Sequence, residues 1–189
     1  FTTVVVIVAG ISIASRYNAT TGGFLEEHVF EGFSKKFPNV DEIIVQDKDK
    51  TIKVKRSGKN WLMVGRSDYR ASSEAVRNIL VGVAELRLKE PKTERKNLYS
   101  RLAVRDVSEP GAKSTLLTIN DKNGEVLATL IVGRETSEVS GASDVGRYIR
   151  KPGEARSWLA EGRLALPNSV NKWVSPQFLN ISNKRVKAV

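Results

Sequence analysis

The stretch Ser72-Ser-Glu-Ala-Val-Arg-Asn-Ile-Leu-Val-Gly-Val-Ala-Glu-Leu-Arg87 holds the clearest helical pattern of the chain and decides its fold class. Its apolar side chains recur at the spacing of one helix face. They are Val76, Ile79, Leu80 and Val83, followed by Leu86 or Arg87. Ser72 is a suitable N-cap, and Glu74 lies in the first turn. Gly82 costs up to about 1 kcal/mol relative to Ala, so we expect another element to approach closely there.

On both sides of this helix the apolar pattern has the two-residue period of strands. The expected strands are 40–45, 51–56 and 61–64 as a meander, 114–120 with 125–132 as a hairpin, and 147–150 with 155–159 as a second hairpin. Residues 88–91 should end the helix, 134–146 should form a long loop, and the Trp173 indole should cover the core. The sequence therefore predicts an α+β domain, with antiparallel meanders packed on one amphipathic helix.

Residues 1–15 carry no charge and are rich in Val and Ile. As a helix they reach only about 22 Å, short of the roughly 30 Å hydrocarbon core of a bilayer. Because the chain opens on Phe1, we interpret them as the back half of an N-terminal transmembrane helix truncated upstream. A signal peptide cleaved after Ser12-Ile-Ala14 and a buried strand are the alternatives. The flank that follows lacks a Lys/Arg cluster, which favours an extracytoplasmic location for the rest of the chain.

Residues 16–39 are expected to be a linker followed by a juxtamembrane amphipathic segment. Four aromatic side chains in this segment are candidates for contact with a membrane or a partner: Phe24, Phe30, Phe33 and Phe37. The alternative is that these rings pack on the sheet of the domain itself.

The 189-residue chain has a net charge of +10, a pI near 9.9 and no cysteine. This charge could form a basic face for anionic headgroups or an acidic partner, or could be a solvated mixed surface. The candidates for a basic face are Arg87, Lys89, Lys92, Arg147, Arg150 and Lys151. Nucleic acid is not expected as a partner, because no aromatic binding motif or recognition helix accompanies the charge.

His28 is the only histidine, and it lacks the His-x-x-x-His spacing of a zinc site. Without a second histidine or a cysteine, the common nucleophile–base pairs are unavailable. We therefore expect no catalytic, metal or cofactor-binding residues, and a protein that is not an enzyme.

Three long segments resemble the domain of unknown function 4340 family. They are 68–93, 111–118 and 148–167, the last reading Tyr-Ile-Arg-Lys-Pro-Gly-Glu-Ala-Arg-Ser-Trp-Leu-Ala-Glu-Gly-Arg-Leu-Ala-Leu-Pro. Family members usually have Gly where this chain has Ala103. The resemblance implies a bacterial envelope protein with one membrane helix, associated with ABC-type export or gliding-like systems, and it implies no catalytic residues.

Together these observations predict an anchor at 1–15, the linker and amphipathic segment at 16–39, the α+β domain at 40–180, and the start of a further truncated α+β unit at 181–189. The expected function is a binding or adaptor module in the periplasm, held in the inner membrane by a single-pass helix. Its expected partners are membrane lipid and the membrane subunits of an ABC-type transporter. The alternatives are an envelope hydrolase or carbohydrate-processing enzyme with part of its site beyond residue 189, and a domain that binds anionic lipid or polymer.

Overall fold

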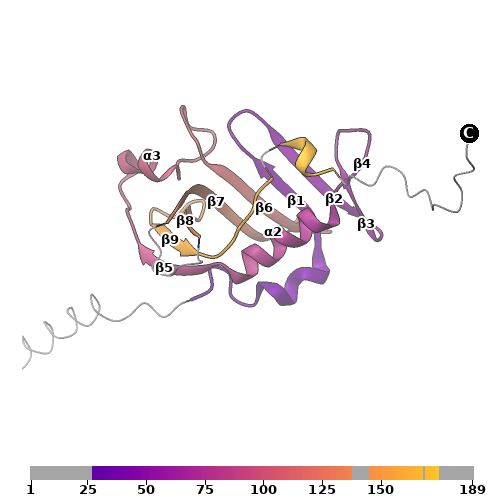
Figure 1. Cartoon of the computed structure of the whole chain (residues 1–189), viewed down its shortest axis with the longest axis horizontal. Helices are drawn as coiled ribbons and strands as arrows, with labels where there is room; N and C mark the ends of the chain where they lie inside the picture. The colour runs from indigo at the N-terminus through magenta and orange to yellow at the C-terminus, as the bar shows by residue number, and fades with distance from the viewer. Residues whose placement is uncertain (1–26, 138–144, 168, 175–189) are drawn as a thin grey trace, which may run out of the picture.

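The computed structural model describes residues 27–137, 145–167 and 169–174 (Figure 1). Within these residues, nine strands form one antiparallel sheet in the order β4-β3-β2-β1-β6-β7-β8-β9-β5. The strands are β1 (Val40–Gln46), β2 (Thr51–Ser57), β3 (Asn60–Met63), β4 (Tyr69–Arg70), β5 (Arg87–Pro91), β6 (Thr115–Asp121), β7 (Val126–Thr136), β8 (Gly146–Arg150) and β9 (Ser157–Glu161). The predicted meander and both predicted hairpins are present, and the β1–β6 and β7–β8 pairings join them into one sheet. The α+β prediction is confirmed.

The predicted helix is α2 (Ser73–Glu85), and its N-cap is Ser72, whose hydroxyl accepts a hydrogen bond of 3.2 Å from the Ala75 N–H. The remaining helical segments are short: α3 (Tyr99–Leu102) and the 3₁₀ helices η1 (Phe33–Asn39), η2 (Lys96–Leu98) and η3 (Val170–Lys172). Val76, Ile79, Leu80 and Val83 all point into the core, so the predicted apolar face is confirmed.

Helix α2 runs across the sheet from the β4 edge to the β5 edge (Figure 1). Its 13 residues span about 20 Å, whereas nine flat strands would span roughly 38 Å. The sheet therefore has to curl around the helix. The chain that follows β9 packs on α2, because a Cβ atom at Gly82 would lie 2.6 Å from the Arg163 carbonyl oxygen. The close approach predicted at Gly82 is confirmed.

The sheet buries side chains on both faces, because successive residues of a strand point to opposite sides. On the α2 face, Leu130, Val132 and Ile149 join the main core, which Trp173 completes with its ring fully buried, as predicted. On the opposite face, Ile131 and Tyr148 pack with a smaller second cluster. That cluster comprises Tyr99, Val104, Ile131, Tyr148 and Leu159.

The α3 segment lies against β7 at Gly133, where any side chain would collide with it. A Cβ atom at Gly133 would lie 2.3 Å from the Leu102 carbonyl oxygen. Ala103 ends α3 in the left-handed conformation, with φ 56° and ψ 42°. Glycine adopts this conformation without steric cost, whereas the alanine present here pays for its Cβ atom.

Several predicted boundaries differ from the structure. Residues 88–91, expected to end the helix, belong with Arg87 to β5, which pairs with β9. The expected loop at 134–146 begins later, because β7 continues to Thr136, and β8 begins at Gly146. The core also begins before residue 40, since Val29 and Phe33 both belong to it.

The phenylalanine-rich segment lies on the domain itself. Phe33 is 2% exposed in the main core, and Phe30 and Phe37 are half-buried against it. The Phe33 and Phe37 rings meet edge to face with centroids 5.6 Å apart. Phe33 is therefore a core residue rather than a membrane or partner contact. Phe24 and the predicted anchor at 1–15 lie outside the described residues. In the part of the chain that is described, no helix is long and apolar enough to cross a bilayer.

Candidate functional site

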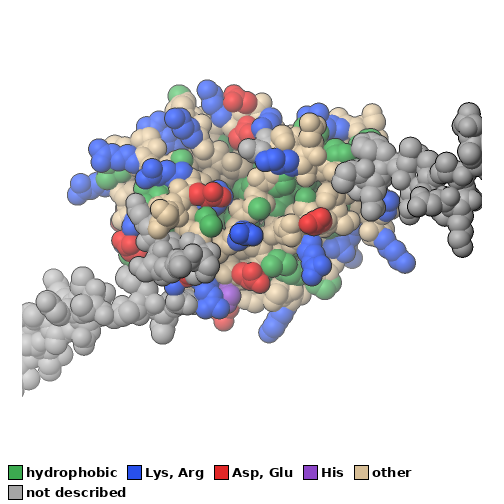
Figure 2. Space-filling model, viewed as in Figure 1, with side chains coloured by type: hydrophobic (Ala, Val, Ile, Leu, Met, Phe, Trp, Pro, Cys, Tyr) green, Lys and Arg blue, Asp and Glu red, His purple; other side chains and the backbone are tan. Residues whose placement is uncertain are grey.

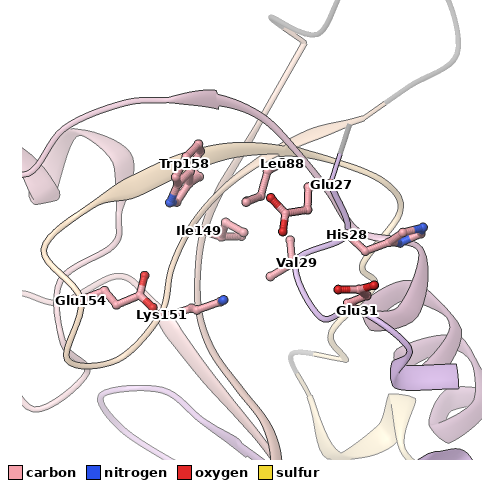
Figure 3. Close-up of a pocket in the computed structure, with 9 residues that line it drawn as sticks. All are labelled: Glu27, His28, Val29, Glu31, Leu88, Ile149, Lys151, Glu154 and Trp158. Atoms are coloured by element: carbon pink, nitrogen blue, oxygen red, sulfur yellow. The ribbon is translucent and has the colours of Figure 1, made fainter. Parts of the chain in front are cut away.

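A hollow of about 320 Å³ lies beside the first described residues of the chain (Figure 3). This volume falls at the small end of the range of ligand pockets. The hollow is lined by Glu27, His28, Val29, Glu31, Leu88, Ile149, Lys151, Glu154 and Trp158. These residues come from four separate parts of the chain, namely the 27–31 segment, β5, the end of β8 with the turn that follows it, and β9.

The 27–31 segment reaches this place by pairing with the edge strand β5. The Val29 N–H donates to the Leu86 carbonyl at 2.9 Å, and the Leu88 N–H donates to the Glu27 carbonyl at 2.8 Å. These two bonds make an isolated antiparallel bridge between His28 and Arg87. They cover the free edge of β5 and hold Glu27 and Glu31 beside the end of the β8–β9 hairpin.

The turn between β8 and β9 supplies the opposite wall. It is closed by a bond of 3.1 Å from the Glu154 N–H to the Lys151 carbonyl, and Gly153 adopts a φ of 80°, which favours glycine. This turn places the Lys151 and Glu154 side chains at the mouth of the hollow. The Lys151 ammonium lies 5.6 Å from the centroid of the Phe30 ring.

The hollow combines an apolar floor with a charged rim. Val29 and Ile149 are buried in the floor, and Leu88 and Trp158 are half-buried beside them. Three exposed carboxylates and one ammonium stand at the rim, so two negative charges are uncompensated. Figure 3 shows the Glu27 carboxylate and the Lys151 ammonium pointing toward the middle of the hollow, while the His28 ring points away from it.

His28 supports the wall rather than offering both nitrogens to a ligand. Its Nδ1 lies 2.9 Å from the Ala84 carbonyl oxygen, near the end of α2. Because a carbonyl only accepts, Nδ1 carries the hydrogen and donates it. The ring thus satisfies one of the carbonyl groups left without a partner at the end of a helix. Among the described residues, no three His, Asp or Glu side chains are placed to share a metal ion.

The six residues considered for a basic face do not lie together. Arg150 is 3% exposed under α3, and Arg147 projects from the other face of β8, where it pairs with Glu135. Burial lowers the pKa of the Arg147 guanidinium, and the Glu135 carboxylate opposes this effect. On β5, Lys89 pairs with Glu161.

Of the remaining three candidates, Arg87 is exposed, Lys92 pairs with Glu90, and Lys151 lies at the hollow. Figure 2 shows Lys and Arg spread over the visible face, with Asp and Glu among them. The structure therefore shows a surface of mixed charge, and these six residues do not form a single basic face.

Sequence patterns did not reveal the hollow, because its walls meet only through the pairing of residues 27–29 with β5. Lys151 was considered only for its charge, while Glu27, Glu31, Glu154 and Trp158 were not considered as site residues. The sequence offered one signal for this site, the alternation of side chains along β8 and β9. This alternation places Ile149 and Trp158 on the same face of the sheet.

No curated protein and no solved structure matches this chain. Residues 61–189 match the family model described as "Domain of unknown function (DUF4340)". This match includes β3 to β9, α2 and the hairpin that forms one wall of the hollow. Because it covers more than half of the sequence, the chain belongs to the DUF4340 family.

Proposed function

We propose that this chain is a membrane-tethered, extracytoplasmic binding module that serves as an adaptor in an ABC-type transport or gliding-like assembly of the bacterial inner membrane. The hollow is the observation that carries the binding role. It is open to solvent, and its apolar floor and charged rim suit a ligand that combines an apolar part with a charged group.

The position of the hollow supports the tethered part of the proposal. Glu27 and Val29 line the hollow, and only residues 16–26 separate them from the uncharged stretch 1–15. Fully extended, this connection reaches at most about 40 Å. If residues 1–15 lie in the bilayer, the hollow stays within reach of the exposed loops of membrane subunits.

Topology and association test the proposal separately. A reporter fused after Val189 is expected to be active only outside the cytoplasm, and cytoplasmic activity would contradict the proposed location. The full chain, purified from detergent-solubilised bacterial membranes, is expected to bring ABC-type transporter subunits with it. Recovery of those subunits should fall in the double variant Glu27→Gln/Glu154→Gln and persist in Glu125→Gln, a control in the β6–β7 turn. A chain that is reproducibly recovered alone would overturn the adaptor role.

A hydrolase is the second candidate, because three carboxylates line one hollow and glycoside hydrolysis uses a pair of them. All three are exposed, and none forms a salt bridge with another described residue. Carboxylates that act as general acids typically lie in environments that hold their proton at neutral pH. The binding role therefore fits the site better. Hydrolysis of peptidoglycan fragments that is lost in Glu27→Gln, Glu31→Gln or Glu154→Gln would favour the enzyme instead.

A further inference from the structure

We propose that the hollow receives a lysine or arginine side chain from a partner protein. The inference rests on the proposed binding role and names the chemistry of the partner. It is argued from the floor of the hollow, the charges at its rim and their spacing.

The floor suits the apolar stem of a long cationic side chain. Lysine and arginine carry several methylene groups below the charge, and these pack on apolar surfaces while the charged end stays near water. Val29, Leu88 and Ile149 provide such a surface, and the Trp158 indole stands beside it.

The rim suits the charge at the end of such a side chain. Among the described residues, Glu27, Glu31 and Glu154 have no salt-bridge partner, so their carboxylates are available to a ligand. The net charge of +10 does not exclude a cationic ligand, because salt screens charges more than about 10 Å apart. The carboxylates next to the hollow therefore decide which charge it favours.

The spacing of the carboxylates favours an organic cation over a metal ion. In the described part of the chain, no group of three acidic or histidine side chains can share one ion. A lysine or arginine side chain can instead place its charged end beside a carboxylate while its methylene groups pack on the apolar floor.

The test uses the full chain in detergent and the probe peptide acetyl-Leu-Lys-Leu-amide. Acetyl-Leu-Gln-Leu-amide is the matched neutral peptide, and Ca²⁺ is the inorganic cation. NMR signals of the three indole N–H groups report binding, because only Trp158 lines the hollow, while Trp61 and Trp173 are buried elsewhere. The Lys peptide is expected to shift the Trp158 signal alone, and the Trp158→Phe variant identifies that signal.

Two variants with opposite expected effects make the result specific. Glu27→Gln/Glu154→Gln should weaken binding of the Lys peptide about threefold to tenfold, as expected for exposed charge pairs. Lys151→Met should strengthen it about twofold, because it removes the one positive charge at the rim. Glu125→Gln should change nothing. Equal binding of the neutral peptide, preference for Ca²⁺, or weaker binding in Lys151→Met would overturn the inference.

The two proposals fail in different ways. If transporter subunits co-purify but the Lys peptide does not bind, the inference about the ligand is wrong and the adaptor role stands. If the Lys peptide binds as described but no transporter subunit co-purifies, the hollow has the proposed chemistry and the adaptor role is wrong.

Discussion

The guanidinium carbon of Arg150 lies 4.7 Å from the centroid of the Tyr99 ring, in a buried contact that fixes the α3 segment on the sheet. The same guanidinium donates from Nε to the Val104 carbonyl and from Nη1 to the Glu154 carbonyl, both at 3.0 Å. Its Nη2 also lies 2.9 Å from the Asp106 carboxylate. One side chain thus joins the 99–106 segment and the β8–β9 turn to β8.

Arg150→Met should lower the free energy of unfolding by about 2–4 kcal/mol, because it leaves two carbonyls and one carboxylate without their donor. Denaturant unfolding of the variant measures this loss. Arg101→Met, at an exposed position of α3, is the matched control and should stay within about 0.5 kcal/mol of the parent. Equal stability of the two variants would contradict the assigned role of Arg150.

Gly82→Ala should destabilise the protein although alanine is the better helix former. The added methyl group would meet the Arg163 carbonyl 2.6 Å away, and moving that backbone costs about 1–3 kcal/mol, more than the gain of about 1 kcal/mol in helix propensity. Thermal unfolding measures the net change. Asn78→Ala, at an exposed position of the same helix, should instead be neutral or slightly stabilising. A neutral or stabilising effect of Gly82→Ala would show that the close contact between Gly82 and Arg163 does not exist.

Ser72→Ala should cost about 1 kcal/mol, since it removes the acceptor of the Ala75 N–H at the start of α2. Ser72→Asp should keep the parent stability or exceed it, because a carboxylate also accepts this bond and is favoured at the positive end of the helix dipole. Urea midpoints of the two variants check the expectation. Equal losses in both would indicate that the hydroxyl caps nothing.

The β1–β2 turn should make a pH-dependent contribution to stability through Asp47. Partial burial raises the pKa of Asp47, but hydrogen bonds from the Asp49 and Lys50 N–H groups and the Lys50 ammonium outweigh this effect and hold the pKa below its ordinary value of 3.8. The folded state therefore binds fewer protons than the unfolded state near this pH. The resulting stability is present above pH 3.8 and is lost as the pH falls through the folded-state pKa.

Asp47→Asn isolates this charge, because the amide oxygen still accepts both backbone bonds. The variant should be less stable than the parent by at most about 1 kcal/mol at pH 6, since water screens this partly exposed group, and the difference should vanish toward pH 2. Unfolding curves recorded across this range measure it. A difference that does not change with pH would mean that the carboxylate charge contributes nothing.

Local patterns predicted the elements whose partners are close in sequence. The Ser72 cap, the apolar face of α2 and the alternation around Ile52 and Val54 all follow from rules that involve a few neighbouring residues. The strand β5 was missed because its pairing partner β9 lies far along the chain, and because Pro91 and the charges around Leu88 indicate a break in structure.

The basic residues show a second limit of prediction from the sequence. Charge alone grouped Arg147 with Arg150, but strand parity places them on opposite faces of β8, and only the three-dimensional fold shows that α3 covers one of them. The hollow depends on a contact of the same nonlocal kind, between Glu27 and Leu88. The carboxylates were visible in the sequence, but their common location was not.

The backbone bridge between residues 27–29 and β5 couples the position of this segment to the shape of the hollow. Glu27 and Val29 are both lining residues and members of this bridge, so any force that displaces them changes the width of the hollow. Linkage is reciprocal, so a ligand held there must in turn resist that displacement. Displacement of residues 27–29 and occupancy of the hollow are therefore thermodynamically linked.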